Sequence, residues 1–394
     1  MFVPAYFEFQ SACRLISGEY ALENIPAEMR SIGSVRPVLL ADRTLEKIGS
    51  VDILLKALEK NNFTPSFIFT DIPLDSSIKS VNEIASLYRS HNADGIIALG
   101  GGSVIDTAKG LRMLISQGGK DILSYAGCEV LPKGQSVPFV AIATTSGTGS
   151  ETTSVAVIKD DAKNVKLEFI SPFLLPDVAV LDVRLLQTMP KHITAITALD
   201  ALTHAVESFS CMQKNPISQS YAIAALRLIN ENVLCAIDNP SDKKARLALA
   251  DAAFLAGAAF SNSMVGIVHA IGHSVGAVSK VPHGSAMTIL LPACLRYNMK
   301  KAKKDYEELL LYMAPETYAE LDESMRSDAF VSLVENLIGE IKKKTNIATR
   351  LAEAGVRRSD FPLIAERAIN DGALIVNPEN ADKLDILKIL DECF

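Results

Sequence analysis

GIIALGGGSVIDTAK, residues 95–109, decides the first half of the fold. The segment begins with an apolar, β-branched run that is typical of a buried strand. Gly100, Gly101 and Gly102 follow, and after them apolar residues recur at helical spacing. Backbone N–H groups at the start of such a helix can bind a diphosphate, with Ser103 as a hydroxyl donor. The alternative is a tight turn that needs glycine, but three glycines exceed that need, which favours a phosphate loop.

The same alternation of strand-like and helix-like segments extends over residues 35–182. The predicted strands are residues 38–41, 66–69, 95–99, 139–143 and 178–181, with hairpin character over residues 155–169. The predicted helices between them are residues 45–60, 78–90 and 104–115. Alternation of this kind predicts a doubly wound, Rossmann-like α/β domain with a parallel sheet.

The pattern changes after Met189 and Pro190. Ala, Leu and Ile then recur at intervals of three and four residues, as in residues 218–234 and 245–260, without strand-like runs. We therefore expect an α/β dinucleotide-binding domain over residues 1–186 and an all-helical metal- and substrate-binding domain over residues 187–394.

Composition excludes several classes of function. With 39 Lys and Arg against 46 Asp and Glu, the net charge is -7, which argues against nucleic-acid and anionic-membrane partners. The six cysteines form no C-x-x-C pair, so neither a structural zinc site nor a disulfide framework is predicted. The N-terminal segment has no signal-peptide pattern, and no segment has the pattern of a membrane helix, so we expect a cytoplasmic protein.

A second glycine-containing loop, TTSGTGSE at residues 144–151, also follows an apolar strand. Small hydroxylated residues between glycines suit a ribose, a phosphate or a carboxamide, although an ordinary polar loop has the same composition. Two such loops after two strands of one sheet would meet in one crevice, which favours a cofactor for both. Asp42 ends another strand, where it would either bond an adenosine ribose or cap a helix.

Four of the six histidines lie between residues 204 and 283. Asp200 and His204 are four residues apart in an Ala- and Leu-rich helix, so they project from one face. His269 and His273 repeat that spacing, and His283 follows in a Pro-His-Gly segment. Histidine nitrogens with one carboxylate suit Fe²⁺ or Zn²⁺. Spacing alone leaves open whether His269, His273 or both bind the ion, and a single core histidine would more often be bonded to a backbone carbonyl.

Six segments of the sequence form one set: the glycine triplet with Asp106 and Lys109, TTSGTGSE, LPDVAVLD at residues 175–182, DALTHAVES at residues 200–208, GIVHAIGHSVGA and VPHGSA. Together they resemble the iron-containing alcohol dehydrogenase family. The motifs occur in the family's order over roughly residues 35–380. The resemblance implies the fold shared with dehydroquinate synthase, an NAD- and Fe²⁺-dependent alcohol dehydrogenase, and a homodimer. The chain differs from the family at residues 72–75, IPLD, where Pro-Asn-Pro is usual.

The resemblance also implies roles for individual residues. It makes Asp200, His204, His269 and His283 the metal ligands and puts His273 near nicotinamide and substrate. There His273 is a catalytic candidate for proton relay, and a structural role is the alternative. It assigns to the cofactor Gly101, Gly102, Ser103, Thr144, Thr145, Thr148 and Lys166. Asp42 stands where members that prefer NAD carry an acid, which favours NAD over NADP.

The expected reaction is hydride transfer between a small alcohol or diol and NAD, with the cation as a Lewis acid. The alternatives are a lyase of the dehydroquinate synthase type and an NADPH-preferring aldehyde reductase of the same fold. The lyase would need several basic residues gathered near the metal motifs, and the basic residues of this sequence are not gathered there. A metal hydrolase would leave the phosphate loops unused, and a non-enzymatic binding protein would leave both sites unused.

Overall fold

The computed structural model describes residues 1–11, 13–127, 131–163 and 165–394. Two compact units form: Ser11–Met189, and Pro190–Phe394 together with Met1–Gln10. The expected division after residue 186 placed the first ten residues in the α/β domain, and here the structure differs. Backbone N–H groups of Phe2 and Gln10 donate to the side chains of Gln219 and Asn262, which accounts for the grouping of this segment with the helices.

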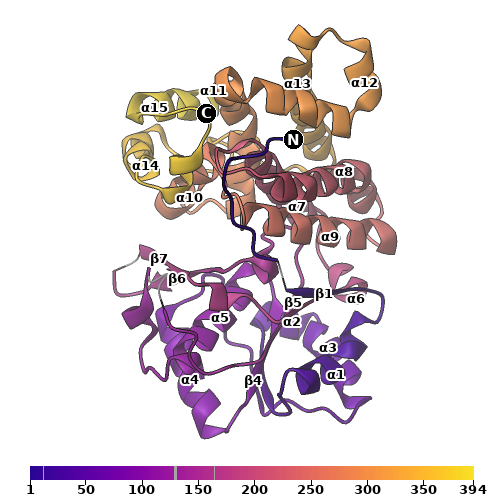
Figure 1. Ribbon diagram of the computed structural model, residues 1–394, viewed down its shortest axis with the longest axis vertical. Helices are drawn as coiled ribbons and strands as arrows, with labels where there is room; N and C mark the ends of the chain where they lie inside the picture. Colours follow the sequence, from indigo (N-terminus) through magenta and orange to yellow (C-terminus); the bar gives the residue numbers. More distant parts are fainter. Residues whose placement is uncertain (12, 128–130, 164) are drawn as a thin grey trace. The chain divides into compact units, whose positions relative to one another are not determined.

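The α/β unit, whose strands β1, β4 and β5 are labelled in Figure 1, has a six-stranded parallel sheet in the order β1-β8-β5-β4-β2-β3. Its strands are β1 (Arg14–Gly18), β2 (Pro37–Leu40), β3 (Phe67–Phe69), β4 (Gly95–Gly100), β5 (Phe139–Ala143) and β8 (Val178–Asp182). A separate antiparallel hairpin is formed by β6 (Val155–Asp160) and β7 (Val165–Ile170), as its sequence predicts. The predicted parallel α/β architecture is confirmed.

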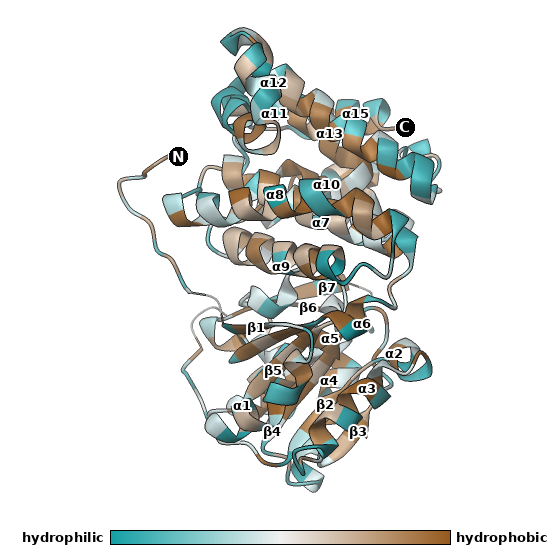
Figure 2. Ribbon diagram, turned by 90° about the vertical axis from the view of Figure 1, so that its right-hand side faces the viewer, coloured by the Kyte–Doolittle hydropathy of each residue, from teal (hydrophilic) through white to brown (hydrophobic). Residues whose placement is uncertain are grey.

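Helices cover both faces of this sheet. The α-helices are α1 (Ile25–Ser31), α2 (Arg43–Lys47), α3 (Ser50–Glu59), α4 (Ile78–Ser90), α5 (Gly102–Ser116) and α6 (Val183–Leu186), and the 3-10 turns are η1 (Ala21–Asn24), η2 (Ile122–Tyr125), η3 (Ser150–Thr152) and η4 (Pro172–Leu174). Alternate residues of a strand point to opposite faces, so Ile96 packs with α4 and α5, while Ile97 packs with α1 and α3. Figure 2 shows the hydrophobic colour of the central strands.

Two elements of this unit depart from the prediction. The edge strand β1 was not predicted, because its sequence, RLISG, occupies only exposed and half-buried positions and has no long apolar run. The helix expected over residues 45–60 is broken at Gly49, whose φ of 83° lies in the left-handed region. The chain therefore forms α2 and α3 in place of one helix.

The second unit is all-helical, as predicted. Its helices are α7 (Lys191–Ser210), α8 (Pro216–Asp238), α9 (Lys243–Phe260), α10 (Ile267–Ser279), α11 (His283–Met313), α12 (Pro315–Glu320), α13 (Glu323–Thr345), α14 (Phe361–Ala368) and α15 (Lys383–Glu392), with 3-10 turns η5 (Arg358–Asp360) and η6 (Gly372–Val376). Helix α7 is the core of the unit, because nearly all its residues from Ala198 onward are buried. It packs against α8, α9 and α11.

Helix α8 is the one helix in the described part of the chain that is long and apolar enough to cross a membrane. Its buried residues, among them Ala222, Leu226 and Ile229, belong to the core of the helical unit and pack toward α7 and α9. Packing within the core therefore accounts for its apolar composition. Free thiols are found at Cys13, Cys211, Cys235, Cys294 and Cys393, and Cys128 lies outside the described residues.

Candidate metal centre and dinucleotide loops

Helix α7 carries the first two candidate ligands. Asp200 and His204 lie one turn apart on the same face and are 2% and 4% exposed. Small alanine side chains on α7 allow its neighbours to approach closely. The sequence spacing therefore puts a carboxylate and an imidazole at one point inside the helical core.

Helices α10 and α11 bring two more imidazoles to this point. His269 lies in the first turn of α10, and His283 is the first residue of α11. Gly284 lets α11 lie directly against the backbone of α7, because a Cβ there would collide with the carbonyl oxygen of Ile196. This close approach leaves His283 Nε2 3.3 Å from Asp200 Oδ1.

The four side chains converge. One potential ligand atom each from Asp200, His204, His269 and His283 lies within 4.8 Å of all the others. The ring centroids of His204 and His269 are 4.5 Å apart, and those of His269 and His283 are 5.5 Å apart. His273 is not in this group. Its ring stacks on that of His283 at a centroid distance of 5.5 Å and an interplanar angle of 16°. His269, and not His273, therefore lies in the group of side chains that could hold a metal ion.

The electrostatics of the cluster suit a cation. Burial lowers the pKa of His204 to about 3 and the pKa of His269 well below its ordinary value, so both rings are neutral near pH 7. Burial raises the pKa of Asp200, but the imidazoles of His283 and His204 outweigh that effect and hold the pKa below its ordinary value. The cluster therefore offers two neutral imidazoles, those of His204 and His269, and one carboxylate.

Three buried atoms of the cluster have no hydrogen-bond partner among the described residues: Asp200 Oδ1, His204 Nδ1 and His269 Nε2. Asp200 Oδ1 is also within ion-pair distance of His283 Nε2. Leaving a buried polar atom unpaired costs about 1–3 kcal/mol. A divalent ion takes nitrogen and carboxylate ligands and would give partners to the unpaired atoms that face it, so the residues fit such an ion.

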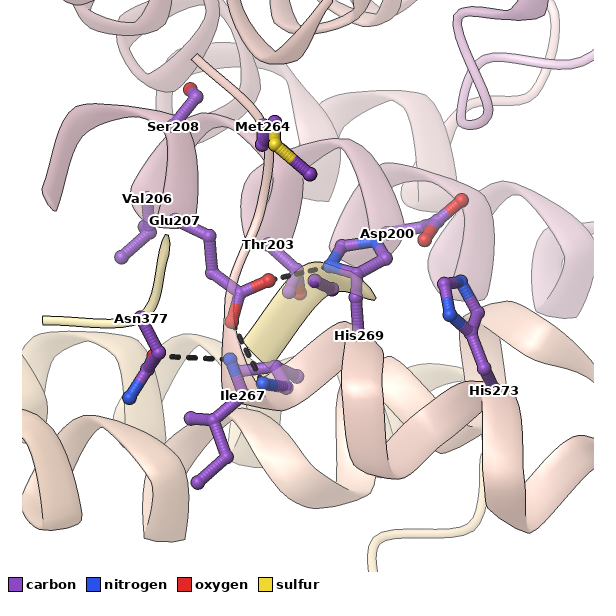
Figure 3. A network of polar contacts seen from close by, with 12 residues as sticks. Asp200, Thr203, Val206, Glu207, Ser208, Met264, Ile267, His269, His273 and Asn377 are labelled. Atoms are coloured by element: carbon purple, nitrogen blue, oxygen red, sulfur yellow. Dashed lines mark hydrogen bonds and ion pairs between the residues drawn. The ribbon is translucent and has the colours of Figure 1, made fainter. Parts of the chain in front are cut away.

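Two acids contact the Nδ1 atoms of His269 and His273, the two histidines on α10; these atoms are called the outer nitrogens below. Glu207 Oε2 lies 2.5 Å from His269 Nδ1, and Glu207 Oε1 accepts a hydrogen bond of 2.7 Å from the backbone N–H of Val268 (Figure 3). Burial raises the pKa of Glu207 to about 7. Asp371 Oδ2 lies 2.9 Å from His273 Nδ1. Sequence analysis missed both acids, although Glu207, seven residues after Asp200, is on the same face of α7.

In the α/β unit the two glycine-containing loops pack against each other. They follow β4 and β5, which are adjacent and parallel, so their carboxyl ends share one edge of the sheet. A Cβ on Gly101 would come within 3.2 Å of Thr145 Oγ1, and a Cβ on Gly102 within 3.3 Å of Thr148 Cγ2. The N-terminus of α5 has no side-chain cap, so its first N–H groups are suited to a phosphate.

A buried lysine anchors these loops. Lys109 Nζ, on α5, donates to Ser150 Oγ at 3.0 Å, to Thr153 Oγ1 at 2.7 Å and to the carbonyl of Val155 at 2.7 Å. Burial lowers the pKa of Lys109 to about 8 and raises the pKa of neighbouring Glu151 to about 7. Lys109, which follows the glycine triplet in the sequence, thus holds the end of the second loop and the start of β6 through three hydrogen bonds.

The other predicted cofactor residues take part in local contacts. Asp42 Oδ1 caps α2 by accepting from the N–H groups of Thr44 and Leu45 at 2.8 and 2.9 Å, which is the helix-cap role. The Thr144 N–H donates to the Gly100 carbonyl at 3.1 Å.

The segment that differs from the family, residues 72–75, engages two of the predicted residues. The Ser103 hydroxyl donates to the carbonyl of Leu74, and Lys166 Nζ lies 2.7 Å from Asp75 Oδ1. Lys166 and Asp75 are both half exposed, so their ion pair is weakly held.

Both halves of the chain match family models. Residues 12–183 match the model described as iron-containing alcohol dehydrogenase, and residues 194–394 match the model described as the C-terminal part of the Fe-containing alcohol dehydrogenase family.

Named relatives extend over nearly the whole chain. The NAD-dependent methanol dehydrogenase of Bacillus methanolicus is 32% identical over 95% of this chain and 96% of its own length. The NADPH-dependent butanol dehydrogenase of Clostridium saccharobutylicum is 34% identical over 92% of both chains. The crystal structure of a 1,3-propanediol oxidoreductase, 31% identical, superimposes with a TM-score of 0.93 and covers 99% of this chain and 100% of that one.

Proposed function

Because this chain belongs to the iron-containing alcohol dehydrogenase family, we propose that it interconverts a small primary alcohol or diol and its aldehyde, with a nicotinamide dinucleotide as the second substrate. The observation that carries the proposal is the buried group of three imidazoles and one carboxylate, with three atoms that lack a hydrogen-bond partner. The match of both halves to this family does not favour the alternative lyase.

Asp200, His204, His269 and His283 would hold the cation in this proposal. Fe²⁺ is favoured by the family, and Zn²⁺ suits the same ligand set. When bound, the cation supplies Lewis acidity to the substrate oxygen, and the nicotinamide gives or accepts the hydride. The chain contributes neutral rings, one anionic ligand and a buried environment in which their charges act strongly.

The dinucleotide would be bound by residues of the two loops and the hairpin: Gly101, Gly102, Ser103, Thr144, Thr145, Thr148 and Lys166. The uncapped start of α5 and the contact between the two loops support this assignment. Asp42 favours NAD, because its carboxylate would repel a 2′-phosphate. Relatives of both kinds exist, one named as NAD-dependent and one as NADPH-dependent, so the preference depends on local residues such as Asp42.

His273 is our candidate for the relay of a proton between substrate and solvent. Its side chain is 40% exposed, its ring stacks on that of His283, and Asp371 accepts from its Nδ1. These contacts leave Nε2 for proton exchange.

We expect His273→Ala to retain metal at the wild-type level and to lower kcat about 10²-fold, the usual contribution of a general acid–base group. Metal analysis and steady-state kinetics on the same preparation measure the two quantities. A variant with full kcat would rule out the relay, and a variant that has lost its metal would assign His273 to the cation instead.

We further propose that the enzyme is a cytoplasmic homodimer. The exposed edge strand β1, which pairs only with β8 among the described strands, supports self-association. Sedimentation equilibrium would give the mass of the assembly, and a monomeric mass at micromolar concentration would contradict the dimer.

The test of the function is a panel of small aldehydes with NADH or NADPH, on protein reconstituted with Fe²⁺ or Zn²⁺. We expect metal-dependent oxidation of NADH, followed at the nicotinamide absorbance band, and a lower rate with NADPH. Metal-free protein serves as the control. Equal turnover without metal, or no binding of either dinucleotide, would contradict the proposal.

A further inference from the structure

Glu207 is a buried acid to which neither the motifs nor the proposed reaction assigns a role. It is 4% exposed and lies on α7, one turn beyond His204. Its two oxygens have different partners, since Oε2 lies 2.5 Å from His269 Nδ1 and Oε1 accepts from the Val268 N–H at 2.7 Å. Both partners are on α10, so this one carboxylate joins the helix of Asp200 and His204 to the helix of His269 (Figure 3).

The contact with Nδ1 determines what the other nitrogen of His269 can do. A carboxylate beside Nδ1 favours the tautomer with the proton on Nδ1, and the lone pair is then on Nε2. Nε2 is buried and has no hydrogen-bond partner among the described residues. In the opposite tautomer Nε2–H would be buried without an acceptor, and the Nδ1 lone pair would face a carboxylate oxygen. The arrangement therefore favours an Nε2 that can bind a cation.

Glu207 also fixes where α10 begins. Gly266 precedes the helix and provides no side-chain cap, and in its place Glu207 accepts from Val268 while Asn377 Oδ1 accepts from the Ile267 N–H at 3.0 Å. A Cβ on Gly266 would come within 2.7 Å of Asn377 Oδ1 and 3.0 Å of Glu207 Oε1, so only glycine leaves room for both acceptors. His269 is one residue after Val268, and its ring is positioned by the same carboxylate.

We propose that Glu207 is a positioning residue for the cation: by contacting Val268 N–H and His269 Nδ1 together, it holds the ring of His269 with its Nε2 directed at Asp200, His204 and His283. This inference rests on the proposed metal site. It assigns to Glu207 a contribution to metal affinity that it makes only through His269.

The test is the affinity of the metal-free enzyme for Zn²⁺, measured by competition with a chelator, in the wild type and in Glu207→Gln. Glutamine has the same shape, but its amide has only one oxygen, so it cannot accept from both Val268 and His269. We expect binding to weaken 10- to 100-fold, the usual effect of removing an outer partner of a histidine ligand. Glu207→Asp, which keeps the charge and shortens the reach, should weaken it less.

Asn377→Ala is the matched control. It removes an acceptor from the same end of α10 but does not contact His269. We expect it to lower the Tm of the metal-free protein while changing Zn²⁺ affinity less than threefold. The inference is overturned if Glu207→Gln binds Zn²⁺ like the wild type, or loses no more affinity than Asn377→Ala. Failure of the metal site itself would be seen separately, as wild-type affinity that Asp200→Ala leaves unchanged.

Discussion

Asp200→Ala should lose bound metal and turnover together, and we expect kcat/KM to fall at least about 10³-fold, or about 4 kcal/mol of transition-state stabilisation. Asp200 is the one carboxylate in the ligand group and is almost fully buried. Without it, a divalent charge would be held by imidazoles alone, with no anionic ligand to balance it. Metal content per subunit and NADH-linked aldehyde reduction measure both losses.

Ser208→Ala is the control for this prediction. Ser208 is also buried on α7, and its hydroxyl bonds to the Ala205 carbonyl of the same helix at 3.0 Å. We expect that variant to keep its metal and its activity. An active, metal-free Asp200→Ala enzyme would remove the chemical basis of the proposed reaction.

Gly284→Ala is expected to destabilise the protein by about 1–3 kcal/mol and to weaken metal binding at least tenfold, although alanine is the better helix former. The added Cβ would meet the backbone carbonyl of Ile196, which cannot rotate away as a flexible side chain can. Helix α11 must then move away from α7 and take His283, its first residue, away from Asp200. Thermal unfolding of the metal-free protein and chelator competition measure the two effects.

The same substitution at Gly339 provides the comparison. Gly339 lies within α13, and a Cβ there would meet no atom within 4 Å. Gly339→Ala should therefore raise stability by about 0.5–1 kcal/mol, as expected for glycine in an open helix position. If Gly284→Ala behaved like Gly339→Ala, the close contact of α11 and α7 would not be what places His283.

Sequence patterns were informative wherever periodicity and burial coincide. The strands at residues 95–99 and 139–143 and the helix at residues 78–90 were predicted within a residue of their observed bounds, because both faces of a central strand are buried and one face of a covering helix is apolar. The pattern was least informative at the surface. Strand β1 has no buried residue, and its pairing with β8 is a contact between residues more than 150 positions apart.

By itself, the sequence determined the two kinds of domain, the two glycine-containing loops and the small set of acids and histidines from which a metal site can be built. These are local properties, since a glycine turn or a four-residue helical spacing depends only on near neighbours. Tertiary structure alone separated His273 from the group of His269, brought His283 to Asp200 through Gly284, and placed Glu207 and Asp371 on the outer nitrogens of His269 and His273. Each of these is a contact between different helices, and helix packing, rather than residue spacing, sets the distance between their side chains.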